Sequence, residues 1–424
     1  MEFICRDCIN VASVSEEIAL ISVGEHECHY CKKLAISAER KDIFSFIENN
    51  FFQSIIPLNE CSPMEIATYY GGCDDLGVSE VWELIEHMEF EDENLERDLT
   101  EYLSDGLSET ENSFVVNDGS LEGNPYEEKW EKFIASISHT QRFFNSEVKF
   151  FLDDLFSVLH IDNNVKSEIC SSLEPEHLLF RARIADTKSE RERIISNPSA
   201  ELGPVPPMLA SDQRMTPNGI SAFYASAERE TCFSEVRAIT GDLVITGEFT
   251  VNHQLKLLDL TKLEQLGQGS YHLFDPDFSE QSNKSYFLKR LMFLLSKPAS
   301  NRQNSSYLET QVIFEYFRVN FASDISGLIF SSVQTGLEGT NVVLFPECSS
   351  VNNYQYKPKH QFEFNEWHQP EFGYYSYRSS KIIESENNET NSMLSFVEES
   401  LKLHYIEAVK TVAKEQSIHI SLDD

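Results

Sequence analysis

The chain has 424 residues, 41% hydrophobic and 25% charged, which is an ordinary globular balance and is long enough for two or three domains. Its 34 basic and 70 acidic residues give a formal net charge of −36, which argues against general nucleic-acid binding. The longest apolar runs fall short of the roughly 20 residues that a membrane helix needs. The N-terminus also lacks a signal pattern, so we expect a cytoplasmic protein without a membrane segment.

Two close pairs of cysteines stand at the N-terminus. They are Cys5 with Cys8 and Cys28 with Cys31, each pair spaced Cys-x2-Cys. Two such turns supply four thiolates, which is the ligand set of a structural zinc site. Four free thiols remain the alternative, and a redox pair is less favoured because the motif occurs twice. We expect a zinc-knuckle segment over residues 1–37.

Residues 38–170 are acidic and have apolar residues at helical spacing, notably over 78–90 and 94–107. They predict a helical domain. In the whole chain, no arginine has a histidine four to six residues after it, which argues against a ribonuclease site of the kind that small helical bundles carry.

Residues 171–350 combine strand and helix patterns, which predicts an α+β domain. Strand patterns occupy 177–184, 219–226, 241–260, 324–332 and 340–348, and helical patterns occupy 285–298 and 307–320. In the C-terminal extension, 351–424, an acidic linker precedes an amphipathic pattern at 393–416 that predicts a final helix.

Polar residues in three parts of the α+β domain are candidates for a site. Arg181 and Arg183 alternate along one strand and so share one face of the sheet, although alone they read as surface arginines. The second part contains Arg214, a Pro-Asn-Gly turn and Tyr224 on a strand. Ser226 is then expected to cap a helix that carries Glu235.

The third part is a glycine-bearing loop between the strands at 324–332 and 340–348. Ser331, Ser332 and Asn341 surround this loop, and loops at the ends of rigid sheets commonly carry sites. The sequence contains no phosphate-binding loop, complete dinucleotide fingerprint or nucleophile elbow that would compete with these candidates.

The order of these motifs resembles the RES domain family over roughly residues 175–350. The motifs are "LFRARI", "GPVPP", "RMTPNGISAFYASAERETCFSEV", "LDLT", "YLETQ" and "GLIFSSVQTGLEGTNVVLF". The cysteine pairs and "WEKFIASISHTQRFF" also resemble the N-terminal domain found before some RES domains. The resemblance implies an ADP-ribosyltransferase-like fold that binds NAD, in a family of bacterial toxins.

Carried over by motif, the resemblance assigns Arg181, Tyr224 and Glu235 to catalysis. Arg214 stands at the family's turn arginine, and Ser332 at its strand-end serine. The turn departs from the family's Arg-Trp-Asn, reading Arg-Met-Thr-Pro-Asn, so the part played by Asn218 stays open. The predicted NAD-binding residues are Arg181, Arg214, Tyr224, Ser332 and Asn341.

The residue types suit cleavage of the nicotinamide–ribose bond. A carboxylate stabilises the positive charge that develops on the ribose, and an arginine offers paired donors to a pyrophosphate. We therefore predict an NAD glycohydrolase or phosphorylase acting as a toxin or anti-phage effector. Transfer of ADP-ribose to a protein and a non-catalytic NAD sensor remain the alternatives. A regulatory or antitoxin-like partner and a homo-oligomer are also considered, and residues alone choose between none of them.

Overall fold

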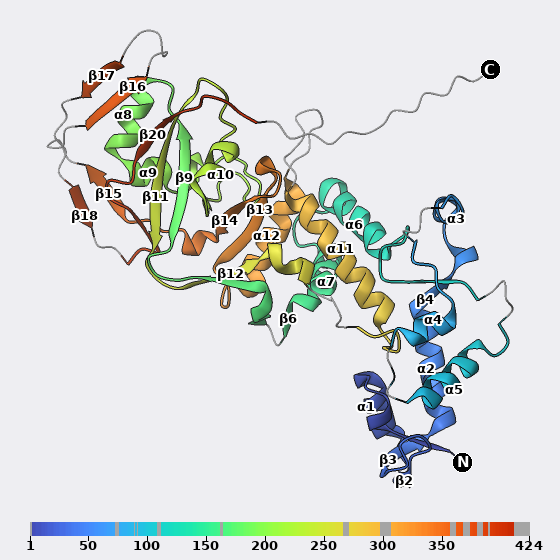
Figure 1. Cartoon of the computed structure of the whole chain (residues 1–424). Helices are drawn as coiled ribbons and strands as arrows, with labels where there is room; N and C mark the ends of the chain where they lie inside the picture. The colour runs from blue at the N-terminus through green and yellow to red at the C-terminus, as the bar shows by residue number, and fades with distance from the viewer. Residues whose placement is uncertain are drawn as a thin grey trace, which may run out of the picture. The chain divides into compact units, whose positions relative to one another are not determined.

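The computed structural model describes residues 2–72, 76–88, 90, 92–107, 112–161, 164–265, 271–296, 307–356, 362–367, 374–379, 385–388 and 391–410. They form two compact units (Figure 1). The first comprises Met1–Phe151 with Glu264–Leu291, and the second comprises Leu152–Leu263 with Met292–Asp424. Among the described residues, no helix is both long and apolar enough to cross a membrane.

The first unit is mainly helical and carries a small sheet at its N-terminal end. Its strands are β1 (Phe3–Cys5), β2 (Glu25–Glu27) and β3 (Leu34–Glu39), in the order β1-β3-β2, with the separate pair β4 (Ile55–Pro57) and β5 (Phe114–Val116). Its helices are α1 (Ala12–Ile21), α2 (Arg40–Ser54), α3 (Pro63–Tyr70), α4 (Val81–Glu86), α5 (Glu93–Ser104) and α6 (Pro125–Ala135), and α7 (Ser146–Leu155) begins in it.

A later segment of the chain also belongs to this first unit. Residues 264–291 contain most of helix α11 (Phe278–Ser296) and the turn before it. From helix α2, the Asn50 side chain donates to the Phe274 carbonyl at 3.0 Å, and the Ser54 hydroxyl donates to the Leu273 carbonyl at 2.9 Å. Phe274 is itself fully buried in the hydrophobic core of the first unit. These long-range bonds tie the two chain segments into one unit.

The second unit is built on a nine-stranded sheet in the order β19-β11-β9-β10-β14-β13-β12-β8, and β20 also pairs with β11. Its neighbouring strands run antiparallel except for the parallel pair β12 and β13. The strands are β8 (Cys170–Leu173), β9 (Leu178–Ile184), β10 (Phe223–Ser226), β11 (Leu243–Val251), β12 (Leu255–Asp259), β13 (Gly327–Ser332), β14 (Gly339–Leu344), β19 (Leu394–Phe396) and β20 (Lys402–Tyr405).

Helices α8 (Lys188–Ser196), α9 (Pro198–Leu202), α10 (Arg229–Glu235) and α12 (Leu308–Phe321) accompany the sheet. The unit also contains the small strand pairs β6 (His160–Ile161) with β7 (Asn164–Val165), β15 (Asn353–Tyr356) with β18 (Ser385–Asn388), and β16 (Phe362–Trp367) with β17 (Tyr374–Ser379). The mixture of helix and sheet confirms the predicted α+β class. The strands and helices expected between 177 and 348 are present.

The prediction of a helix at 393–416 is wrong for residues 394–405. β19 and β20 instead both pair with β11, and Phe396 lies opposite Phe249. The two rings pack edge to face at 5.6 Å in the core. Pairing with a free sheet edge and burial of Phe396 therefore outweigh the helical spacing of the segment. Residues 411–416 lie outside the described residues.

The strand β9 opens the sheet at one place. It pairs with β11 at seven positions, from Leu178 to Ile184, but with β10 only where Phe180 faces Ser226. Beyond Phe180 no further pairing of the two strands is found, so among the described residues that edge of β9 has no partner strand. This opening is where the predicted site residues gather.

Candidate functional site

A cavity of about 330 Å³ lies where β9 and β10 diverge. Four arginines line it, namely Arg181, Arg183, Arg214 and Arg237, whereas its acidic lining residues are Asp212 and Glu235. The cavity thus has a net positive lining within a chain whose formal charge is −36. Such a cavity attracts a small anionic ligand without making the whole surface attractive to polyanions.

Arg181 is a buried cation with no ion pair among the residues that the structure describes. It lies on β9, and its guanidinium carbon stands 5.0 Å from the centroid of the Phe223 ring. Its Nη1 is buried and has no hydrogen-bond partner within the same described residues. Burial, followed by the positive charge of Arg183, lowers the pKa of Arg181 to about 9. A buried donor without a partner is costly, so this atom is prepared for an incoming acceptor.

Arg214 presents a second buried donor of the same kind, because in the described part of the chain its Nη1 also has no hydrogen-bond partner. The loop that carries Arg214 is held by the hydroxyl of Tyr224, which accepts from the Met215 amide at 3.1 Å and lies 3.1 Å from the Thr216 hydroxyl. Burial raises the pKa of Tyr224 to about 12. Tyr224 therefore lines the cavity and also anchors the Arg214 loop by hydrogen bonds.

Glu235 is the last residue of helix α10, and a single oxygen of its carboxylate receives two hydrogen bonds. The Ser332 hydroxyl donates to Oε1 at 2.6 Å and the Asn341 amide donates to the same atom at 2.7 Å. Ser332 ends strand β13 and Asn341 lies on the paired strand β14, so three distant parts of the sequence meet here. The arrangement holds a carboxylate in one orientation at the cavity wall.

The predicted cap of helix α10 is wrong. The helix begins at Arg229 with Glu228 at its N-cap, and the Ser226 hydroxyl donates to Asn341 Oδ1 at 2.9 Å instead. Glu228 accepts from the Thr231 hydroxyl and from the Thr340 amide, both at 2.9 Å. The start of the helix is thereby tied to strand β14.

Most of the predicted site residues meet in this cavity. Arg181, Arg214, Tyr224, Glu235 and Asn341 line it, and Ser332 is buried directly behind Glu235. The sequence patterns did not identify Arg237 or the contact of Ser226. Arg237 follows the helix in a left-handed conformation, with φ of 53°, which no local motif announces.

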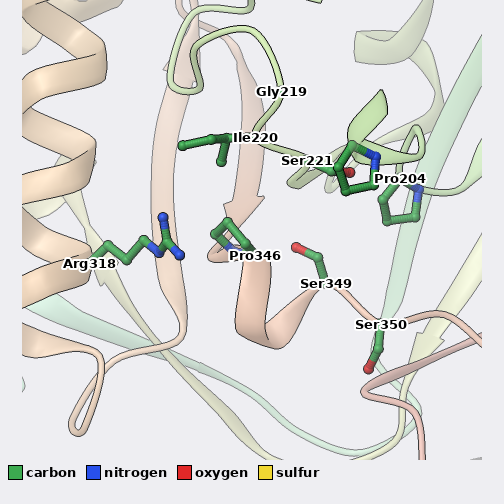
Figure 2. Close-up of a pocket in the computed structure, with 9 residues that line it drawn as sticks. Pro204, Gly219, Ile220, Ser221, Arg318, Pro346, Ser349 and Ser350 are labelled. Carbon is green, nitrogen blue, oxygen red and sulfur yellow. The ribbon is translucent and has the colours of Figure 1, made fainter. Parts of the chain in front are cut away.

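A second cavity in the same unit has a volume of about 380 Å³ and a different lining (Figure 2). Pro204, Pro207, Ile220 and Pro346 give it an apolar surface, and Arg318 reaches toward it from helix α12. Arg318 is paired with Glu347 and Glu315, and the Ser349 hydroxyl donates to the Leu344 and Phe345 carbonyls. The polar groups named here already have partners, so this cavity is the weaker candidate.

The four N-terminal cysteines converge in the first unit. Their sulfur atoms lie within 4.8 Å of one another. Three of the Sγ–Sγ separations are 3.5 to 3.6 Å, close to the about 3.8 Å between ligands of a tetrahedral site with Zn–S bonds of about 2.3 Å. Lys32 after the second pair has φ of 59°, and its amide donates to the Cys28 carbonyl. The Cys5, Cys8, Cys28 and Cys31 geometry therefore fits a metal ion.

The arginine-lined cavity of the α+β unit has the charge and the fixed carboxylate that suit a small anionic ligand. Comparison with protein families identifies a RES domain over residues 179–365 and a HEPN/RES N-terminal domain 1 over residues 22–149. The chain therefore contains a RES domain and carries the N-terminal domain associated with it. No curated protein and no solved structure matches the chain significantly.

Proposed function

We propose that the protein is an enzyme that degrades NAD by cleaving the bond between nicotinamide and ribose. The observation that carries this proposal is found in one cavity. Two arginines there each have a buried Nη1 with no hydrogen-bond partner among the described residues, and a carboxylate is held on one oxygen. The match to the RES domain supports an NAD-related activity. The hydrolysis of the bond, and the residues assigned to it, are the parts that we propose.

In this proposal Arg181 and Arg214 bind the pyrophosphate. Their buried Nη1 donors would each gain a charged acceptor, and hydrogen bonds between charged groups are the stronger kind. Tyr224 keeps the Arg214 loop in place and offers its ring to the ribose or nicotinamide. The net positive lining would compensate the two negative charges of the pyrophosphate.

Glu235 would stabilise the transition state. As the glycosidic bond breaks, nicotinamide departs with the bonding electron pair as a neutral base, and the ribose becomes cationic at C1′. The Glu235 carboxylate, fixed by Ser332 and Asn341, places negative charge close to that carbon. Water then adds to C1′ and loses a proton, which gives ADP-ribose, nicotinamide and one proton.

The test is incubation of the full chain with NAD and chromatography of the products, with and without phosphate. We expect nicotinamide and ADP-ribose, and a phosphorylated ADP-ribose in place of the second product would identify phosphate as the acceptor. If label from the adenine moiety becomes attached to a macromolecule, the reaction is transfer of ADP-ribose and not hydrolysis. The proposal is wrong if none of these reactions occurs while NAD binds.

We further propose that the domains end at residues 37, 170 and 350.

We also propose that the four cysteines hold a structural Zn²⁺, which when bound cross-links the two turns of the segment. Metal analysis of the full chain is expected to give about one zinc per chain, and almost none in a variant that carries both Cys28→Ser and Cys31→Ser. Zinc retained by that variant would refute the assignment.

We also propose a toxin role, because unrestrained loss of NAD harms the cell that makes the enzyme. Control would come from the N-terminal unit or from an antitoxin-like partner. Expression of the wild type should arrest growth and lower cellular NAD, whereas a Glu235→Gln variant at the same level should not. Growth arrest by both proteins would separate toxicity from NAD cleavage.

A further inference from the structure

Ser226 makes a contact that neither the motif nor the proposed chemistry uses. It is the last residue of β10, its side chain is 3% exposed, and it lies directly opposite Asn341 in the pairing of β10 with β14. Its hydroxyl stands 2.9 Å from Asn341 Oδ1. Asn341 is in turn 4% exposed and bonded to Glu235. Ser226, Asn341 and Glu235 therefore form a buried chain that ends at the cavity.

Chemistry fixes the direction of both hydrogen bonds. An ionised carboxylate only accepts hydrogen bonds, so the atom of Asn341 that lies 2.7 Å from Glu235 Oε1 has to be the amide nitrogen. The amide oxygen then faces Ser226, whose hydroxyl donates to it and also lies beside the Cys232 thiol. A reversed amide would set two acceptor oxygens against each other at the Glu235 end.

The amide needs this support because it is one of two groups that orient Glu235. Ser332 and Asn341 both donate to Oε1, and in the described part of the chain Oε2 receives no hydrogen bond. Oε2 is therefore the oxygen left for a substrate. Rotation of the Asn341 amide would break one of the two hydrogen bonds that orient the Glu235 carboxylate.

We propose that Ser226 is a positioning residue, which orients Glu235 by fixing the Asn341 amide. This inference rests on the proposed function, in which Glu235 acts on the ribose. Ser226 also lines the cavity, but its hydroxyl donates to Asn341 and not to Glu235, so in this proposal its effect passes through Asn341. This role differs from that of an ordinary buried serine in a sheet because the effect of Ser226 on Glu235 depends on Asn341.

The test is a double-mutant cycle of Ser226→Ala and Asn341→Ala, measured as kcat and KM for NAD. Ser226→Ala alone should lower kcat about tenfold, the effect of about 1.4 kcal/mol from one hydrogen bond, with KM within about twofold. In the Asn341→Ala background the same change should have no further effect on kcat. An equal loss of kcat in both backgrounds would overturn the proposal.

Two comparisons guard against a trivial loss of folding. Ser349→Ala removes another buried hydroxyl of the same unit, one that bonds backbone groups, and should leave kcat unchanged. Ser226→Thr keeps the hydroxyl and Ser226→Val has the same shape without it. Thr is expected to retain kcat and Val to lose it. Equal kcat in the folded Thr and Val variants would also overturn the proposal.

A structural readout separates this inference from the proposed function. In crystals of Ser226→Ala, we expect the Asn341 amide to rotate away from Glu235 Oε1. An unchanged separation of 2.7 Å between Asn341 Nδ2 and Oε1 would reject the positioning role whether or not NAD is cleaved. If the wild type cleaves no NAD, the proposed reaction fails, while the crystal result still decides whether Ser226 holds the amide.

Discussion

The second unit contains two cavities of similar size, about 330 and 380 Å³, that differ in how their polar groups are satisfied. In the cavity between β9 and β10, Arg181 and Arg214 each keep a buried nitrogen that has no hydrogen-bond partner among the described residues. In the proline-lined cavity, Arg318 is paired with Glu347 and Glu315. Volume alone would rank the two cavities the wrong way round.

The difference shows where the fold leaves buried hydrogen-bond donors unsatisfied. A buried donor without an acceptor costs about 1–3 kcal/mol, and the fold bears this cost at two neighbouring arginines in the same cavity. Such a cost persists where a ligand supplies the missing acceptor. In the proline-lined cavity, Arg318 is already paired with glutamates of the protein, so it has few donors left to recognise a ligand.

The largest effect is expected from Glu235→Gln. The change keeps the shape of the side chain but removes the negative charge, and we expect kcat to fall by about 100- to 1,000-fold, the usual cost of losing one group that stabilises the transition state. Nicotinamide release under saturating NAD measures it. Glu230→Gln on the same helix is the matched control, since Glu230 is exposed. Equal losses in the two variants would remove Glu235 from the reaction.

Arg181→Gln and Arg214→Gln come next. Each removes a charge-assisted contact to the pyrophosphate, which predicts a rise in the KM for NAD of about 10- to 100-fold. The matched control is Arg318→Gln in the proline-lined cavity. A rise in KM for Arg318→Gln, with none for the other two variants, would reverse the assignment of the two cavities.

Tyr224→Phe should have a smaller effect on turnover, about two- to tenfold from one or two hydrogen bonds to the Arg214 loop. Its signature lies in stability at high pH. Because the folded protein raises the pKa of Tyr224 from its usual 10 to about 12, the wild type loses the stability contributed by this group as pH rises from 10 toward 12. The phenylalanine variant lacks that loss.

Denaturant titrations of wild type and Tyr224→Phe at pH 8 and pH 11 measure this difference. The stability advantage of the wild type should shrink at pH 11. An advantage that stays constant between the two pH values would show that the hydroxyl is not held in its neutral form by burial.

The sequence predicted which side chains meet in one cavity better than it predicted the chain path around that cavity. Arg181, Tyr224 and Glu235 belong to motifs that each form a strand or a helix of their own. The packing of residues 264–291 into the first unit depends on bonds such as that from Asn50 to the Phe274 carbonyl, over 200 residues apart. No local pattern encodes such a contact.

The C-terminal strands illustrate the same limit. Residues 394–405 carry helical spacing, but the free edge of β11 and the core position of Phe396 decide their conformation. The bond from Ser226 to Asn341 likewise arises only once β10 and β14 are paired. Sequence motifs identified the chemical groups, and the assembled sheet determined their partners.

The most direct test of the account is a crystal structure of the Glu235→Gln variant soaked with NAD, in which slow turnover preserves the ligand. We expect the pyrophosphate between β9 and β10, with its oxygens within hydrogen-bond distance of Nη1 of both Arg181 and Arg214. The C1′ carbon of the nicotinamide ribose should face the side chain at position 235. NAD in the proline-lined cavity, or a pyrophosphate that leaves both arginine nitrogens without partners, would contradict the account.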